Sequence, residues 1–287
     1  MNFLVLSLAL VLTGGGAFAD PVRVVAAENF YGDLAHQIGG EHVAVVSILS
    51  NPDQDPHLFE ASPQTARAVA SAQIVIANGA DYDPWMARLL AASPAPARRQ
   101  IDVGALVGAR PGDNPHLWYG LANIKVAARS LADALVAVDS SHAEDYRAGE
   151  AKFLSSLKPI DDKLGDMHKR HQGVAVAASE PVFGYAAEAV GLDVREQKFA
   201  LAVMNDSEPA PSDVALFESD LRGHKVRTMI YNSQAREPSV EKLVALAKAS
   251  GVPVVGVTET EPPNVRYQDW MARELDALDE ALGAPVN

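Results

Sequence analysis

Apolar and polar positions divide the chain into two stretches of alternating short strands and helices. In the first stretch, continuous apolar runs rich in valine, isoleucine and alanine are typical of strands buried on both faces. Ser62-Pro63 marks a helix start, because serine caps a helix and proline fits its first turn. The predicted strands lie at residues 22–27, 43–49, 74–77 and 101–103, and the predicted helices at residues 31–38, 63–70 and 85–92.

Residues 121–171 follow a different pattern and carry no strand signal. Apolar side chains recur there at helical intervals, which predicts one buried face of a long helix. This apolar stripe consists of Tyr146, Phe153, Leu157, Ile160, Leu164 and Met167. Pro159 interrupts it, so we expect a kinked helix, with two helices broken at Lys158-Pro159 as the alternative.

The alternation of strands and helices then resumes. Strands are predicted at residues 174–178, 229–231 and 254–258, helices at residues 183–190, from Pro211, at 240–249 and at 268–282, and an irregular stretch up to Asn205. This order predicts an α/β fold with two lobes, each a mainly parallel sheet flanked by helices, joined by a long backbone helix. The expected lobes are residues 20–142 and 172–287, and the linking helix is residues 143–171.

Residues 1–19 have the features of a secretory signal peptide. An apolar run at residues 3–12 precedes three glycines and the small-x-small sequence Ala17-Phe18-Ala19. A membrane anchor, the alternative, needs about 20 apolar residues, and the glycines end this run earlier. The chain has no cysteine, so it has neither a lipid-attachment cysteine nor a disulfide framework. We therefore expect cleavage near Ala19 and a periplasmic location.

Composition and charge narrow the class of protein. Of the 287 residues, 48% are apolar, which is typical of a folded α/β protein and not of a disordered chain. The net charge is −13 and no basic cluster occurs, so nucleic acid is not an expected partner.

One short motif occurs twice, as Asp55-Pro56-His57-Leu58-Phe59 and as Asn114-Pro115-His116-Leu117-Trp118. Proline restricts its own φ and the residue before it, so each histidine is presented from a stiff loop. The leucine and the aromatic ring are suited to anchor that loop in the core. Two rigid histidines among only eight in the chain indicate a metal site, because such sites need ligands that packing holds in place.

The second lobe supplies carboxylates where its strands end, at Glu180 and at Glu259 or Glu261. Two imidazoles and two carboxylates suit Zn²⁺, Mn²⁺ or Fe²⁺. Because the pairs come from different lobes, the ion would lie at the lobe interface. The remaining six histidines are expected at the surface.

These residues, taken in order, resemble the solute-binding proteins of ABC importers for zinc and manganese, the ZnuA/TroA-like group. The resemblance covers nearly all of the mature chain and rests on both histidine motifs, Asn78-Gly79 with Trp85, Ser179-Glu180 before Phe183-Gly184-Tyr185, and Glu208-Pro209. It implies two α/β lobes joined by a backbone helix. It also implies a metal held by His57, His116, Glu180 and a final carboxylate, for which Glu259 is preferred because it directly follows a strand.

The chain departs from the family pattern in three places. Glu259 stands where aspartate is usual, Gly120 stands where an acidic residue usually follows the tryptophan, and there is no histidine-rich acidic loop. In the family, glutamate at the position of Glu180 is associated with manganese. The general stability order of divalent metals, in contrast, favours zinc at any nitrogen–oxygen site. Both metals therefore stay open.

The expected function is that of a monomeric periplasmic receptor that delivers Zn²⁺ or Mn²⁺ to an ABC permease in the inner membrane. The alternative is a metal-dependent periplasmic hydrolase, but the sequence has no His-Glu-x-x-His helix, no Gly-x-Ser-x-Gly turn and no phosphate-binding glycine loop. A third class, a receptor for an organic solute, is not excluded by the low aromatic content of 6%.

Overall fold

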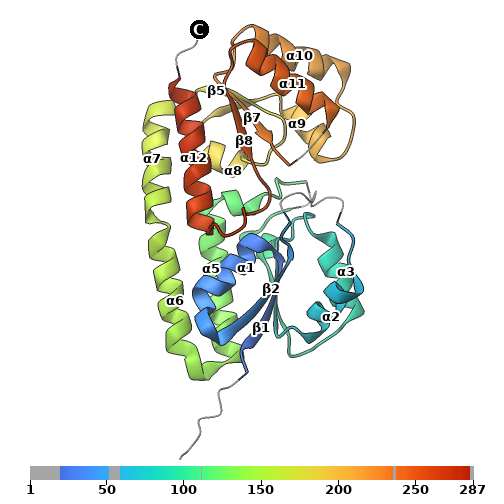
Figure 1. Cartoon of the computed structure of the whole chain (residues 1–287), viewed down its shortest axis with the longest axis vertical. Helices are drawn as coiled ribbons and strands as arrows, with labels where there is room; N and C mark the ends of the chain where they lie inside the picture. Colours follow the sequence, from blue (N-terminus) through green and yellow to red (C-terminus); the bar gives the residue numbers. More distant parts are fainter. Residues whose placement is uncertain (1–19, 52–58, 111, 235–236, 285–287) are drawn as a thin grey trace, which may run out of the picture.

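A computed structural model describes residues 20–51, 59–110, 112–234 and 237–284. The expected signal peptide 1–19 and the predicted ligand His57 lie outside the described residues. The structure has two four-stranded parallel sheets, one in each half of the chain. Figure 1 shows them as two lobes, one above the other, with helices running along one side of both. The predicted α/β fold class is thus confirmed.

The first sheet has the strand order β2-β1-β3-β4. Its strands are β1 (Val22–Glu28), β2 (Val43–Leu49), β3 (Ile74–Ala77) and β4 (Arg99–Asp102). The helices of this half are α1 (Asn29–Gly39), α2 (Pro63–Ser71), α3 (Pro84–Ala92), α4 (Val103–Val107) and α5 (Leu121–Val138). The predicted cap of α2 is confirmed, since the Ser62 hydroxyl accepts a hydrogen bond from the Thr65 amide.

The second sheet repeats this order as β6-β5-β7-β8. Its strands are β5 (Ala175–Ala178), β6 (Asp193–Arg195), β7 (Met229–Asn232) and β8 (Val254–Val257). The helices of this half are α8 (Gly184–Val190), α9 (Gln197–Met204), α10 (Pro211–Arg222), α11 (Pro238–Ala249) and α12 (Tyr267–Gly283). In parallel sheets of this kind, functional groups gather at the carboxyl ends of the strands where the strand order reverses. Those ends belong to β1 and β3 in one lobe and to β5 and β7 in the other.

Two predicted elements were wrong in detail. The stretch before Asn205, expected to be irregular, contains β6 and α9, because a three-residue strand is too short to show an alternating pattern. Val103, predicted to end a strand, instead begins α4, since the Asp102 carboxylate caps the Ala105 amide at 2.9 Å.

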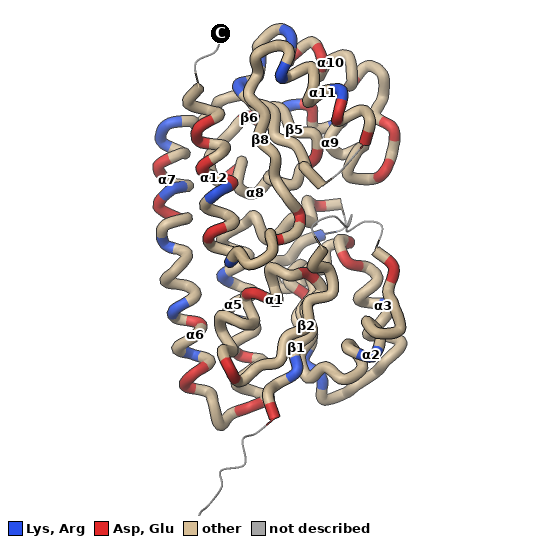
Figure 2. Tube along the Cα trace, in the orientation of Figure 1, with Lys and Arg blue, Asp and Glu red and all other residues tan. Residues whose placement is uncertain are grey.

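The long helical segment consists of α6 (Ala143–Ser156) and α7 (Lys158–His171). They meet at Leu157, whose backbone keeps a helical conformation, and Figure 1 shows them running on in nearly the same direction. The segment is thus two helices, as the alternative interpretation predicted. The break lies at Leu157, one residue before the expected Lys158-Pro159. Charges of both signs line α7 and α12 (Figure 2), where Arg170 donates to Asp279 at 2.7 Å. His171, expected at the surface, is buried against the same carboxylate, with its Nε2 at 2.9 Å.

One hydrophobic core runs through both lobes. At its centre, the rings of Phe30 and Trp118 stack with centroids 4.6 Å apart, and Tyr119 packs edge-on against Phe183 of the second lobe at 4.9 Å. Trp270 of α12 approaches Phe30 at 6.1 Å. The interface between the lobes is therefore a packed aromatic core. In the part of the chain that the structure describes, no helix is both long and apolar enough to cross a bilayer.

Gly149 lies where α6 packs closely against α1. A Cβ at this position would lie 2.3 Å from the carbonyl oxygen of Ile38, at the end of α1. Gly165, on α7, is exposed, and a Cβ added there would meet no atom within 4 Å. The two helical glycines therefore differ only in what surrounds them.

We expect Gly149→Ala to destabilise the protein by about 1–3 kcal/mol, since the methyl group would push α6 away from α1. The matched change Gly165→Ala should stabilise it by about 0.5–1 kcal/mol, because alanine favours a helix interior. Urea unfolding followed by circular dichroism measures both. Equal stabilisation by the two variants would contradict the close contact.

Candidate metal-binding site

His116 is the best-defined member of the predicted site. It lies between α4 and the 3₁₀ turn Leu117–Tyr119, and its own side chain is fully buried. Leu117 and Trp118 are completely buried beneath it, as the motif predicted. In the first motif, Phe59 packs on Trp85 with centroids 4.4 Å apart.

Asn114 fixes the orientation of the His116 ring. The Asn114 Nδ2 group donates to the Pro181 carbonyl at 2.7 Å, so its Oδ1 atom faces the histidine as an acceptor. That oxygen lies 2.6 Å from His116 Nδ1 and 3.1 Å from the His116 amide. The hydrogen of a neutral imidazole therefore sits on Nδ1, which leaves the lone pair on Nε2. Asn114 thus fixes both the tautomer and the orientation of the His116 ring.

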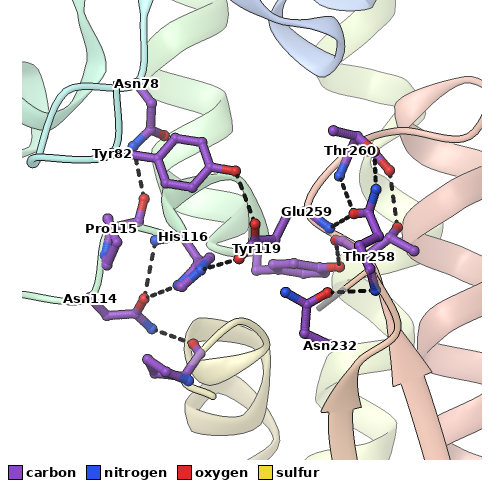
Figure 3. A network of polar contacts seen from close by, with 12 residues as sticks. Asn78, Tyr82, Asn114, Pro115, His116, Tyr119, Asn232, Thr258, Glu259 and Thr260 are labelled. Carbon is purple, nitrogen blue, oxygen red and sulfur yellow. Dashed lines mark hydrogen bonds and ion pairs between the residues drawn. The ribbon is translucent and has the colours of Figure 1, made fainter. Parts of the chain in front are cut away.

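Glu259 lies opposite this lone pair. Its Oε1 atom is 3.0 Å from His116 Nε2, and both side chains are fully buried (Figure 3). An imidazole nitrogen without hydrogen and a carboxylate both present lone pairs, so a cation, either a proton or a metal ion, must lie between them. The pair joins the first lobe to the second.

Side chains from two other segments, Gln234 after β7 and Tyr82 of the first lobe, hold Glu259 in place. The Gln234 Oε1 atom accepts from the amides of Glu259 at 2.6 Å and Thr260 at 3.1 Å. The Tyr82 hydroxyl of the first lobe donates to Glu259 Oε2 at 3.4 Å. Burial, together with the charge of Glu259, raises the Tyr82 pKa well above its usual value.

Glu261, the other candidate for the final carboxylate, has different neighbours. Its amide donates to Asn29 Oδ1 at 3.0 Å, and its carbonyl accepts from Asn29 Nδ2 at 2.6 Å. Burial raises the pKa of its carboxyl to about 9, and the nearby Asp33 charge adds to this. Of the two glutamates, Glu259 is the one in contact with His116.

Glu180 follows β5 by two residues and is buried. Its neighbour Pro181 accepts the hydrogen bond from Asn114, and the Tyr185 hydroxyl donates to the Asn114 carbonyl at 2.8 Å. These two bonds hold the loop of Glu180 against the loop of His116. Glu180 and Asn114 line the same cavity.

The structure therefore brings His116 and Glu259 into contact and binds the loop of Glu180 to the loop of His116. Over residues 20–51, 59–110, 112–234 and 237–284, no three histidine, aspartate or glutamate side chains are grouped so as to hold a metal. The predicted set of four includes His57, which these ranges omit.

Several residues that support the site were not singled out as contacts from the sequence. Asn78 donates to the Pro115 carbonyl at 2.8 Å and accepts from the Tyr31 hydroxyl at 3.0 Å, which fixes the His116 loop from below. Asp83 accepts from the amides of Asn78 and Gly79, both at 2.8 Å. Burial raises the pKa of Asp83 to about 6. From the sequence, only Asn78-Gly79 of this network was marked, as part of the family resemblance.

The same buried region contains a further acid, Glu28, at the end of β1. Burial is the main cause that raises the pKa of Glu28 well above its usual value, and the Asp83 charge adds to it. Buried carboxyls of this kind either hold a proton or need a cation nearby. The interior beneath the His116 loop therefore disfavours additional negative charge.

Comparison with known proteins relates the chain to a family. The model of the ZnuA family, described as zinc-uptake complex component A, periplasmic, matches residues 24–281. The chain is 25% identical over 307 residues to the manganese-binding lipoprotein MntA of Halalkalibacterium halodurans, a match that covers 98% of this chain and 97% of the relative.

Solved structures share the fold at low sequence identity. The periplasmic zinc-binding protein TroA of Treponema pallidum matches with a TM-score of 0.78 and 18% identity, over 93% of this chain and 100% of TroA. The binding protein FpvC of Pseudomonas aeruginosa, in complex with Mn²⁺, matches with a TM-score of 0.74 and 19% identity, over 92% and 98% of the two chains.

The family match spans both lobes and both proposed ligand pairs, and its description is that of an uptake component and not of an enzyme. The resemblance inferred from the motifs is thereby confirmed: the chain belongs to the ZnuA family of metal-uptake binding proteins.

Proposed function

We propose that this protein captures a divalent transition-metal ion between its two lobes and delivers it to the permease of an ABC importer. The observation that carries the proposal is the buried contact between His116 Nε2 and Glu259 Oε1 at 3.0 Å, which joins one lobe to the other. A metal ion in place of the bridging proton would be bound by both lobes at once. Membership of the ZnuA family supports this role.

The proposed ligands are His57, His116, Glu180 and Glu259. Two imidazole nitrogens and two carboxylates neutralise a divalent charge and suit Zn²⁺ or Mn²⁺. Support comes from the Asn114 bonds that align His116 with the Glu180 loop, and from the Gln234 bonds that hold Glu259. Binding would displace protons from the ligands.

The cargo is Zn²⁺ or Mn²⁺. Glutamate at position 180 favours manganese by resemblance to the family, and the relative MntA is named for manganese. TroA is named for zinc, and the stability order favours zinc. Competition between the two ions at the purified protein decides between them.

The proposed setting is the periplasm, with residues 1–19 removed near Ala19 and the mature protein acting as a monomer. The hydrophobic run and small residues before Asp20 support export. The alternative hydrolase gains no support, since four protein ligands leave little room for substrate and the family description concerns uptake.

The variants His57→Ala and His116→Ala should each lower metal affinity by at least about 100-fold, because each removes one of four ligands. Equilibrium dialysis against Zn²⁺ and Mn²⁺, separately and in competition, measures this. The exposed His36→Ala serves as the control and should bind like the parent. Undiminished binding by both ligand variants would place the site elsewhere.

The two candidate carboxylates are separated by a matched pair of substitutions. Glu259→Gln should weaken metal binding by at least about tenfold, since a neutral amide is a poorer ligand than a carboxylate. Glu261→Gln should leave affinity near that of the parent, because the backbone of Glu261 bonds Asn29 and its carboxyl lies near the Asp33 charge, whereas Glu259 contacts His116. Isothermal titration calorimetry measures both. The reverse order of effects would make Glu261 the ligand.

Asn114→Ala should reduce metal affinity by about 10–100-fold although it removes no proposed ligand. The substitution frees the His116 ring and breaks the bond to Pro181 that holds the Glu180 loop. The same titration measures the loss, with Asn205→Ala on the exposed end of α9 as the control. Full retention of affinity would show that the ring needs no such support.

A further inference from the structure

Glu274 is a buried carboxyl on α12 with no role among the proposed ligands. Its Oε1 atom accepts from Trp270 Nε1 at 2.8 Å and from the Thr258 amide at 3.1 Å. Its Oε2 atom lies 2.5 Å from the Tyr119 hydroxyl. Thr258 directly precedes Glu259, and Tyr119 ends the turn that begins after His116. Glu274 thus contacts the residue before Glu259 and the turn that follows His116.

The Tyr119 hydroxyl makes two short contacts with oxygen atoms. Its hydroxyl oxygen lies 2.6 Å from the Thr258 carbonyl and 2.5 Å from Glu274 Oε2. A tyrosine has one hydrogen to donate, and a carbonyl can only accept. If Glu274 were ionised, one of these two short oxygen–oxygen contacts would have no hydrogen. Both are satisfied when Tyr119 donates to the carbonyl and a protonated Glu274 donates to Tyr119.

The surroundings of Glu274 supply no compensating cation among the described contacts. The titratable groups that face it are Tyr119 from the first lobe, Tyr267 on its own helix and, beyond Tyr119, Glu259 after β8. From α1, Asp33 contacts the backbone of Tyr267.

Three basic residues of α7, the other helix packed on α12, pair with carboxylates of α12 other than Glu274. Lys163 pairs with Asp276, and Arg170 and His171 pair with Asp279, on the following turns of α12. Neither of these carboxylates shares a contact with Glu274 among the described hydrogen bonds. The groups that face Glu274 are thus neutral or negative.

We propose that Glu274 is held as a neutral acid and acts as a positioning residue, whose proton ties the Thr258–Glu259 segment to the turn that follows His116. The effect on metal binding rests on the proposed function. The protonation of Glu274 rests on its contacts alone. Burial supports it, since it raises the pKa of Glu274 to about 7.

This proton gives the tie a defined pH dependence. The folded protein keeps the proton above the pH at which an unfolded glutamate loses it, near 4.5. Between that pH and about 7 the folded state binds more protons than the unfolded state, so the contribution of Glu274 to stability falls as pH rises. Above about pH 7 the side chain ionises in the folded state. The single hydrogen of Tyr119 then serves either Glu274 or the Thr258 carbonyl, so one of the two contacts that make up the tie is lost.

The variant Glu274→Gln tests the proton. Its amide NH₂ group donates to Tyr119 as the acid does, and it cannot ionise. The melting temperature of the metal-free variant, relative to the parent, should rise by at least about 2 °C between pH 5 and pH 8. The control Glu280→Gln makes the same change on the exposed face of α12 and should follow the parent at both pH values. A relative melting temperature that stays constant or falls would contradict the proposal that Glu274 is protonated in the folded protein.

The release of Mn²⁺ to a chelator in stopped flow tests the positioning role. The ratio of release rates, parent over Glu274→Gln, should rise at least threefold between pH 6 and pH 8. Tyr119→Phe breaks the tie at every pH and should release at pH 6 at the rate that the parent reaches at pH 8. A flat ratio, with the expected melting shift, would overturn the positioning role alone. Failure of the parent to bind Mn²⁺ or Zn²⁺ would overturn the proposed function, and the melting result would still decide the proton.

Discussion

The structure depends on a buried imidazole–carboxylate contact that crosses from one lobe to the other. Burying His116 and Glu259 completely removes both from water, and such a pair is stable only when its remaining hydrogen-bonding groups are satisfied. Asn114 accepts from the imidazole at one end, and the Tyr82 hydroxyl donates to the carboxylate at the other. Contacts from the surrounding loops therefore hold the two facing atoms, His116 Nε2 and Glu259 Oε1, 3.0 Å apart.

The repeated sheet order explains how the chain delivers side chains to one place. Each lobe carries its strands in the order second, first, third, fourth, so the point of reversal lies at the end of the first and third strands. Glu180 follows β5 and Asn78 follows β3, each at the point of reversal of its own lobe. Packing the lobes with these edges facing each other gathers loops that are distant in sequence. Figure 3 shows the polar network that results.

Much of this arrangement was predictable from local sequence. The Pro-His-Leu-aromatic motif gives a rigid histidine above an apolar anchor, and burial of Leu117 and Trp118 confirms the anchor. The supporting contacts were not predictable in this way. The bonds between Asn78 and Pro115 and between Gln234 and Glu259 join distant segments. The sequence around an asparagine or glutamine in a loop does not indicate which residue it will bond. The protonation of Glu274 likewise follows from three-dimensional contacts alone.

The aromatic core that continues from Phe30 through Trp118 to Trp270 limits how far the two lobes can separate. Wide separation of the lobes would expose these rings to water, at a cost of about 25 cal/mol for each Å² of apolar surface. This cost opposes a wide opening of the two lobes. A change of conformation confined to the loops between the lobes would leave the aromatic core packed.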